Sequence, residues 1–82
     1  MEYNRLKWAS RRGMLELDLV LMPFLENIYP TLAESDQQLY VKLLECEDQD
    51  LYGWFLKHKE PPTAELKQIV KIILDNTGLK VN

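Results

Sequence analysis

The amino-acid sequence predicts an all-α protein, a small, compact five-helix bundle that forms a single domain over residues 1–82. Three observations support this prediction. A chain of 82 residues is the size of one small domain with a thin core. Hydrophobic residues make up 46% and charged residues 28% of the chain, which is typical of a folded globular protein. Apolar residues recur at helical spacing, and the alternating pattern of a β-strand is nearly absent.

The first two predicted helices lie on either side of a glycine. The first covers residues 4–11, with Asn4 as its N-cap, and Gly13 ends or bends it. The second covers residues 14–29 and has a wide apolar surface. We therefore expect it to be the central helix, covered on most sides by the others. Its apolar residues are Leu15, Leu17, Leu19, Leu21, Met22, Phe24, Leu25 and Ile28.

Two prolines shape the second helix. Pro23 lies inside it and removes one backbone hydrogen bond, so we expect a kink there. Pro30 should end the helix, because the residue before a proline is disfavoured in the α region. The third helix then begins at Ser35, which together with Gln38 has the spacing of a capping box. Its expected buried residues are Leu39, Tyr40, Leu43 and Leu44.

The fourth helix is predicted over residues 49–57, with Asp48 as its N-cap. Gly53 weakens this helix by roughly 1 kcal/mol relative to alanine and allows a neighbouring segment to approach closely. His58 is expected in its last turn, where it would suit the helix dipole. The expected buried residues are Leu51, Trp54 and Phe55.

The fifth helix follows a break at Pro61 and Pro62, and Thr63 is its expected N-cap. Its apolar pattern is the clearest in the chain and consists of Leu66, Ile69, Val70, Ile73 and Leu74. Residues 76–79 resemble a glycine C-cap with an apolar residue folding back.

The charges are unevenly distributed. Residues 1–12 carry a net charge of +3, residues 13–56 of −8 and residues 57–82 of +2. This separation favours electrostatic steering toward a partner, although chance clustering on a solvated surface would give the same pattern. No apolar run reaches the ~18 residues of a membrane helix, and no signal peptide is recognisable. We therefore expect a protein that stays where it is made and does not contact a membrane. We also expect it to be a monomer.

The sequence offers few residues for catalysis or metal binding. It has one cysteine, Cys46, and one histidine, His58, so no internal disulfide or His/Cys metal site is expected. We expect Cys46 to be a small buried side chain at a helix end. Residues 48–53 resemble half of a calcium-binding EF-hand loop, but the twelfth loop position is Lys59 instead of glutamate. Gly-rich phosphate loops are absent, and the acidic chain lacks a basic DNA-recognition face, so we expect no nucleic acid partner.

The junction between the first two helices stands out among the remaining features. Arg12, Gly13 and Glu16 crowd this break. One interpretation is an exposed local ion pair between Arg12 and Glu16, worth ~0–1 kcal/mol. The other is a contact surface, in which Gly13 allows a partner backbone to approach while the two charged residues bond across the interface.

These residues carry a family resemblance. Residues 12–16 match the pattern R-G-x-x-E, inside the longer run R-R-G-M-L-E-L-D at 11–18. Further matches are M-P-F at 22–24, L-L-E-C-E-D at 43–48 and D-L-Y-x-W at 50–54. On these motifs, nearly the whole chain resembles the succinate dehydrogenase assembly factor family, the flavinylation factors.

The resemblance implies a function in assembly. Members are small helical proteins of the bacterial cytoplasm or mitochondrial matrix. They bind the flavoprotein subunit of succinate dehydrogenase, and in some bacteria that of fumarate reductase, and they assist covalent attachment of FAD to a histidine of that subunit. FAD then belongs to the partner, and we expect this bacterial, cytoplasmic chain to bind no cofactor stably and to be no enzyme. The partner-binding residues implied here are Trp8, Arg11, Arg12, Gly13, Glu16 and Asp50.

Two other functions remain open at this point. One is a regulatory protein-binding module such as an antitoxin, which a pull-down would separate from an assembly factor by the partner that it recovers. The other is an enzyme or a direct FAD carrier, which would need a nucleotide loop or a sizeable pocket. Trp54 is the last residue of the D-L-Y-x-W match at 50–54, which we call the second family element. It is expected in the core, because a large aromatic residue at helical spacing usually packs inside.

Overall fold

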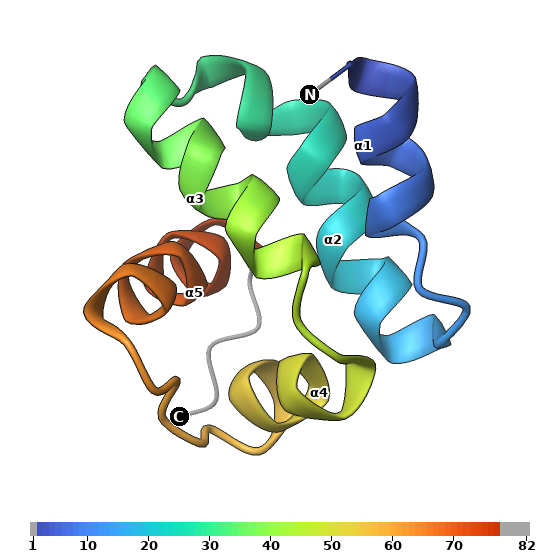
Figure 1. The fold of residues 1–82 in the computed structure, drawn as a ribbon. Helices are drawn as coiled ribbons and strands as arrows, with labels where there is room; N and C mark the ends of the chain where they lie inside the picture. The colour runs from blue at the N-terminus through green and yellow to red at the C-terminus, as the bar shows by residue number, and fades with distance from the viewer. Residues whose placement is uncertain (1, 78–82) are drawn as a thin grey trace.

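The computed structural model describes residues 2–77 and confirms the all-α class (Figure 1). Five α-helices and one short 3-10 helix account for most of these residues, and none of them lies in a strand. The elements are α1 (Tyr3–Ser10), α2 (Leu15–Asn27), η1 (Tyr29–Thr31), α3 (Glu34–Leu44), α4 (Asp48–Leu56) and α5 (Ala64–Thr77). None of these helices is both long enough and apolar enough to cross a membrane.

Helix α2 lies at the centre of the bundle, as expected. It contacts α1, η1, α4 and α5, while α3 packs against α5 and α1. In Figure 1, α1 lies beside α2 on one side of the molecule, and α4 and α5 lie toward the other side. The connections between helices are short, so each helix packs against its neighbours through one apolar face.

The core draws large side chains from all five α-helices. Tyr40 of α3 is fully buried, and its ring centre lies 5.4 Å from those of both Phe24 and Tyr29. Its hydroxyl is hydrogen-bonded to the buried hydroxyl of Ser10 at 2.7 Å, so the one polar atom of this side chain is satisfied. Other buried apolar residues are Leu6, Leu17, Val20, Leu21, Leu25, Leu43, Leu44, Leu51, Trp54, Phe55, Ile69, Val70 and Ile73.

Three of the predicted N-caps are wrong. Helices α1 and α3 begin one residue before the expected cap, and α4 begins at it. Asn4, Ser35 and Asp48 therefore lie inside the first turn. The N-cap positions are taken by Glu2, Ala33 and Glu47, and none of their side chains makes a capping hydrogen bond. The prediction for α5 is confirmed, because the Leu66 backbone N–H donates to Thr63 Oγ1 at 3.2 Å.

Helix α2 differs from the prediction in its end and in its outer face. It ends at Asn27, and Pro30 lies inside the following 3-10 helix instead of ending α2 directly. Pro23 lies inside the helix, as expected. The expectation that α2 is covered on most sides is wrong for Leu15 and Leu19, which are 68% and 65% exposed.

The end of α4 also differs from the prediction. The helix ends at Leu56, and His58 lies beyond it with φ of 55°, in the left-handed region, instead of in its last turn. The Lys59 N–H donates to the Gly53 carbonyl at 3.0 Å, which folds the connection back on the helix. A Cβ at Gly53 would lie 3.3 Å from Lys59 Cδ, so this glycine does permit a close approach. The predicted C-cap at residues 76–79 extends beyond the described residues.

Candidate functional site

The connection between α1 and α2 is built around a glycine that no other residue replaces without strain. Gly13 has φ of +79°, a backbone conformation that L-residues rarely adopt. The glycine is exposed, and a Cβ built on it would meet no atom within 4 Å. The structure therefore leaves open space over Gly13. Within this chain, glycine is required at this position only because of its backbone conformation.

Arg12, next to it, binds four groups of its own chain. Its Nε donates to Asp48 Oδ1 at 2.7 Å, and the two groups form an ion pair. Nη1 donates to the carbonyls of Ala9 and Leu44 at 2.9 Å each, and Nη2 donates to the Cys46 carbonyl at 2.7 Å. Ala9 belongs to α1, Leu44 ends α3, Cys46 lies between α3 and α4, and Asp48 begins α4. The side chain of Arg12 thus joins two segments that are far apart in the sequence.

The backbone of Arg12 is also held. Its N–H donates to Asp18 Oδ1 at 2.8 Å, which ties the connection to the first turns of α2. The interpretation of Arg12 and Glu16 as a local ion pair is wrong, because Arg12 pairs with Asp48. Glu16 is exposed in the first turn of α2, where a carboxylate suits the positive end of the helix dipole.

The other candidate residues near this connection are exposed, except for Trp54. Arg11 is exposed beside Arg12, and Trp8 is 77% exposed on α1. Asp50 is exposed in the same first turn of α4 that provides Asp48. The Arg12–Asp48 pair joins the start of α4 to the α1–α2 connection, and Asp50 lies in the same turn of α4 as Asp48. Trp54 of the second family element is buried, as expected.

A hollow of about 360 Å³ opens between α1 and α2 beside this connection. Trp8 and Met22 give it apolar surface, and its remaining lining residues are Asn4, Lys7 and Arg11. Both charged residues at this hollow are basic, in keeping with the positive N-terminal segment. Neither of them forms an ion pair within residues 2–77.

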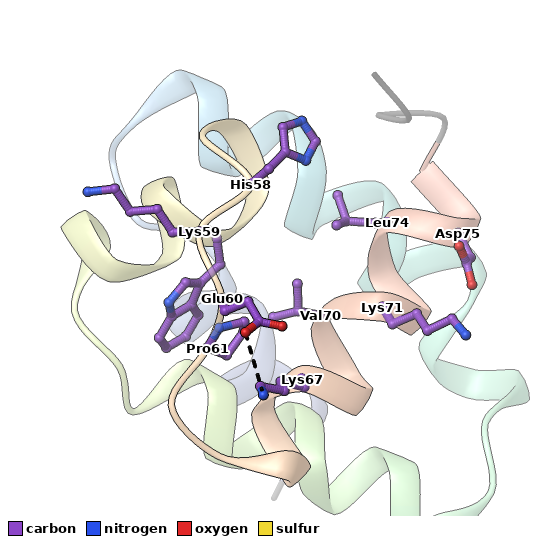
Figure 2. Close-up of a pocket in the computed structure, with 10 residues that line it drawn as sticks. His58, Lys59, Glu60, Pro61, Lys67, Val70, Lys71, Leu74 and Asp75 are labelled. Atoms are coloured by element: carbon purple, nitrogen blue, oxygen red, sulfur yellow. Dashed lines mark ion pairs between the residues drawn. The ribbon is translucent and has the colours of Figure 1, made fainter. Parts of the chain in front are cut away.

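A larger hollow of about 470 Å³, which we call the α4–α5 groove, lies between the end of α4 and helix α5. Figure 2 shows Val70 and Leu74 pointing into it, whereas the amines of Lys59 and Lys71 point away from it. Glu60 and Lys67 form an exposed ion pair of 3.7 Å at its edge. The groove therefore presents mixed and outward-directed charges, which do not converge on one ligand group.

Cys46 and His58 are not paired in the structure. His58 lines the α4–α5 groove, whereas Cys46 lies just after α3 and its thiol contacts the Lys42 carbonyl at 3.9 Å. Cys46 is half-buried, not buried as predicted. Partial burial and the carboxylates of Asp50 and Glu45 raise its pKa, which keeps the thiol protonated. Among the described residues, no group of three or more His, Cys, Asp or Glu side chains could hold a metal ion.

The residues that hold the site together were not predicted from the sequence. Asp18 and Asp48 both lie in the matched motifs, yet Asp48 was interpreted as a helix cap and Asp18 was given no role. Their partner was not predictable from spacing, because Asp48 is 36 residues from Arg12 along the chain. The exposure of Leu15 and Leu19 was missed as well, although two apolar stripes on one short helix could have indicated it.

The comparisons with known proteins identify a family for this chain. The sequence profile of the family described as "Flavinator of succinate dehydrogenase" matches residues 4–77. The protein named FAD assembly factor SdhE from Pseudomonas putida is 60% identical over 79 residues, which are 96% of this chain and 94% of that relative. The protein of the same name from Yersinia pestis is 49% identical over 69 residues, or 84% of this chain and 78% of the relative. The one from Shewanella oneidensis is 47% identical over 70 residues, or 85% of each chain. The chain therefore belongs to the family of flavinators of succinate dehydrogenase.

Proposed function

We propose that this chain is an assembly factor that binds the flavoprotein subunit of succinate dehydrogenase and promotes covalent attachment of FAD to it. The chain belongs to the flavinator family, and the observation that carries the proposal is the shape of its α1–α2 connection. There Gly13 is exposed with open space above it, and an internal network fixes its backbone. The relatives named above are described as FAD assembly factors, not as antitoxins, so the regulatory alternative has no comparable support.

The geometry supports different roles for the residues of the connection. Arg12 is occupied within the chain, so we assign it to positioning the connection. Gly13 leaves room for a partner backbone, and the exposed charges of Arg11 and Glu16 can form oriented hydrogen bonds with that partner. A preorganised surface loses little conformational freedom on binding, which favours affinity.

The mechanism that we propose is stabilisation of one state of the partner. Attachment needs the target histidine of the subunit to lie close to the flavin methyl group. A helper promotes this step by binding the competent arrangement of the subunit more tightly than the other arrangements. The population of the competent arrangement rises only by the ratio of these affinities. The reacting groups then belong to the flavin and to the subunit. We further propose that the chain acts as a cytoplasmic monomer and that it serves the flavoprotein of fumarate reductase by the same surface.

The test measures covalent flavin on apo flavoprotein subunit of succinate dehydrogenase. The subunit is mixed with FAD, with or without this chain, and covalent flavin is followed by in-gel fluorescence. Gly13→Arg is the informative variant, because the open space over Gly13 accepts a side chain and the cost to the fold is the backbone strain alone, about 1–2 kcal/mol. We expect wild type to accelerate labelling and Gly13→Arg to abolish the effect and the complex.

Urea unfolding of Gly13→Arg provides the control for folding, and Glu16→Ala tests the charged side of the same surface. If wild type neither accelerates labelling nor forms a complex on a sizing column, the proposed function is wrong. If Gly13→Arg and Glu16→Ala both act as wild type does, the function stands and the site assignment fails. The flavoprotein of fumarate reductase, tested in parallel, decides whether the chain serves both subunits.

A further inference from the structure

The outer face of α2 carries two large apolar side chains that the core does not use. Leu15 and Leu19 are 68% and 65% exposed, although the opposite face of the same helix is buried. Residues four apart lie one helical turn apart, so these two side chains are neighbours on the surface. Single exposed leucines are ordinary, but adjacent ones continuing into further apolar surface mark an interaction site.

The apolar surface continues from α2 onto α1. Met22 lies one turn beyond Leu19 and lines the hollow between the two helices together with Trp8. Trp8 is 77% exposed, and tryptophan is among the residues that most often dominate binding energy at interfaces. We define the α1–α2 face by its four apolar residues, Trp8, Leu15, Leu19 and Met22.

Charged residues border this face on two sides. Glu16 lies one turn before Leu19, so the face is continuous with the Gly13 connection. On the other side, Lys7 and Arg11 line the hollow beside Trp8 and have no ion pair within the described part of the chain. An apolar centre with a charged rim is the usual organisation of a protein–protein interface.

We propose that the α1–α2 face binds an apolar segment of the flavoprotein subunit, flanked by a carboxylate that meets Lys7 and Arg11. The face supplies most of the affinity, while the charged residues of the connection steer and orient the subunit. This inference rests on the proposed function. It goes further by placing the affinity mainly in residues outside the R-G-x-x-E charges.

The flavoprotein is the occupant that the observations favour. The face adjoins the connection that we assign to the flavoprotein, so one partner can cover both without a second binding event. The basic hollow requires an acidic group on the partner, because two unpaired cations would otherwise be desolvated without compensation. A second copy of this chain is the competing occupant, and the test includes it.

The test compares two double variants in titrations of apo flavoprotein subunit of succinate dehydrogenase. Leu15→Gln with Leu19→Gln replaces the apolar surface by polar side chains of similar length and good helix propensity. Leu15→Met with Leu19→Met is the matched control, because it keeps an apolar surface of similar volume. Arg11→Gln tests the charged rim. Each variant is first compared with wild type by urea unfolding, since residues this exposed should not affect stability.

We expect the glutamine pair to weaken binding at least about tenfold, mainly through faster dissociation, and the methionine pair to bind as wild type does. Arg11→Gln should slow association and reduce its dependence on salt. If wild type itself does not bind, the proposed function is at fault. If wild type and the glutamine pair bind equally, the function stands and this inference is overturned. The inference is also overturned if wild type self-associates in sedimentation, the glutamine pair does not, and both bind the subunit equally.

Discussion

Arg12 belongs to a recognition motif, yet its side chain binds its own chain and positions the site instead of forming its exposed surface. A guanidinium has five N–H groups, and four of those of Arg12 donate to acceptors of the same chain. Its side chain is only 15% exposed. Its neighbours Arg11 and Glu16 are the ones that face solvent. Contact with a partner therefore falls mainly to these neighbours, and Arg12 determines where they lie.

Replacing Arg12 by lysine should destabilise the fold. An ammonium has at most three donors and lacks the planar fork that reaches separate carbonyls and the Asp48 carboxylate. We expect the free energy of unfolding to fall by about 2 kcal/mol, measured by urea denaturation. Arg11→Lys is the control and should change it by less than about 0.5 kcal/mol. Equal stability of both variants and wild type would mean that the network is not formed in solution.

The two faces of α2 explain why one helix serves both folding and binding. Its buried stripe, which includes Leu17, Leu21 and Phe24, meets α1, α4 and α5. On its outer stripe, Leu15 and Leu19 remain exposed. Binding can therefore be changed on one face while the packing of the other is preserved.

The end of α4 holds a strained residue that can be relieved. His58 has φ of 55°, which costs an L-residue about 1 kcal/mol or more and costs glycine almost nothing. We expect His58→Gly to raise the free energy of unfolding by about 0.5–1 kcal/mol, after the greater freedom of glycine in the unfolded chain is counted. Thermal or urea unfolding measures this gain.

His58→Ala is the matched control for this prediction. Alanine removes the imidazole but keeps the Cβ and therefore the strain, so it should give no gain. If alanine stabilises the protein as much as glycine does, the imidazole and not the backbone is the source of the cost.

Across the whole molecule, one buried hydrogen bond connects α1 to α3. The hydroxyls of Ser10 and Tyr40 are 2.7 Å apart and both residues are fully buried. This contact holds α1 against the rest of the bundle and so positions the α1–α2 connection that follows Ser10. Burial raises the pKa of Tyr40 to about 12, while the hydrogen bond from Ser10 and the charge of Arg12 act in the opposite direction.

The raised pKa of Tyr40 makes stability depend on alkaline pH. The pKa of an unfolded tyrosine is 10.0, so the folded state favours the neutral phenol. This stabilisation is complete below pH 10.0 and is lost as the pH rises toward the folded pKa of about 12. Over this window we expect wild type to lose up to roughly 3 kcal/mol relative to Tyr40→Phe.

Urea unfolding of both proteins at several pH values across this window provides the measurement. The two proteins differ only in the Tyr40 hydroxyl, so the difference between their stabilities isolates this group. A difference that stays constant with pH would show that the Tyr40 hydroxyl is solvated in the folded state.

Local chemistry made most of the fold predictable. The five helices, the central place of α2 and the Thr63 cap follow from periodicity and capping preferences that act within a few residues. The errors at Asn4, Ser35 and Asp48 are of one kind, because several residues near a helix start could serve as a cap. The sequence pattern does not say which candidate is left outside the first turn.

Part of the candidate site was likewise predictable from local sequence, and part depended on tertiary packing. A short motif of neighbouring residues identified the positions of Gly13, Glu16 and the exposed Arg11. Three of the four side-chain acceptors of Arg12 lie more than thirty residues away along the chain. Only the packing of α4 against α2 therefore places Asp48 within reach. Likewise, the pattern shows that Leu15 and Leu19 are apolar, whereas the positions of the other helices decide that solvent, not core, surrounds them. Periodicity determines which residues share a face, and tertiary packing determines which faces are covered.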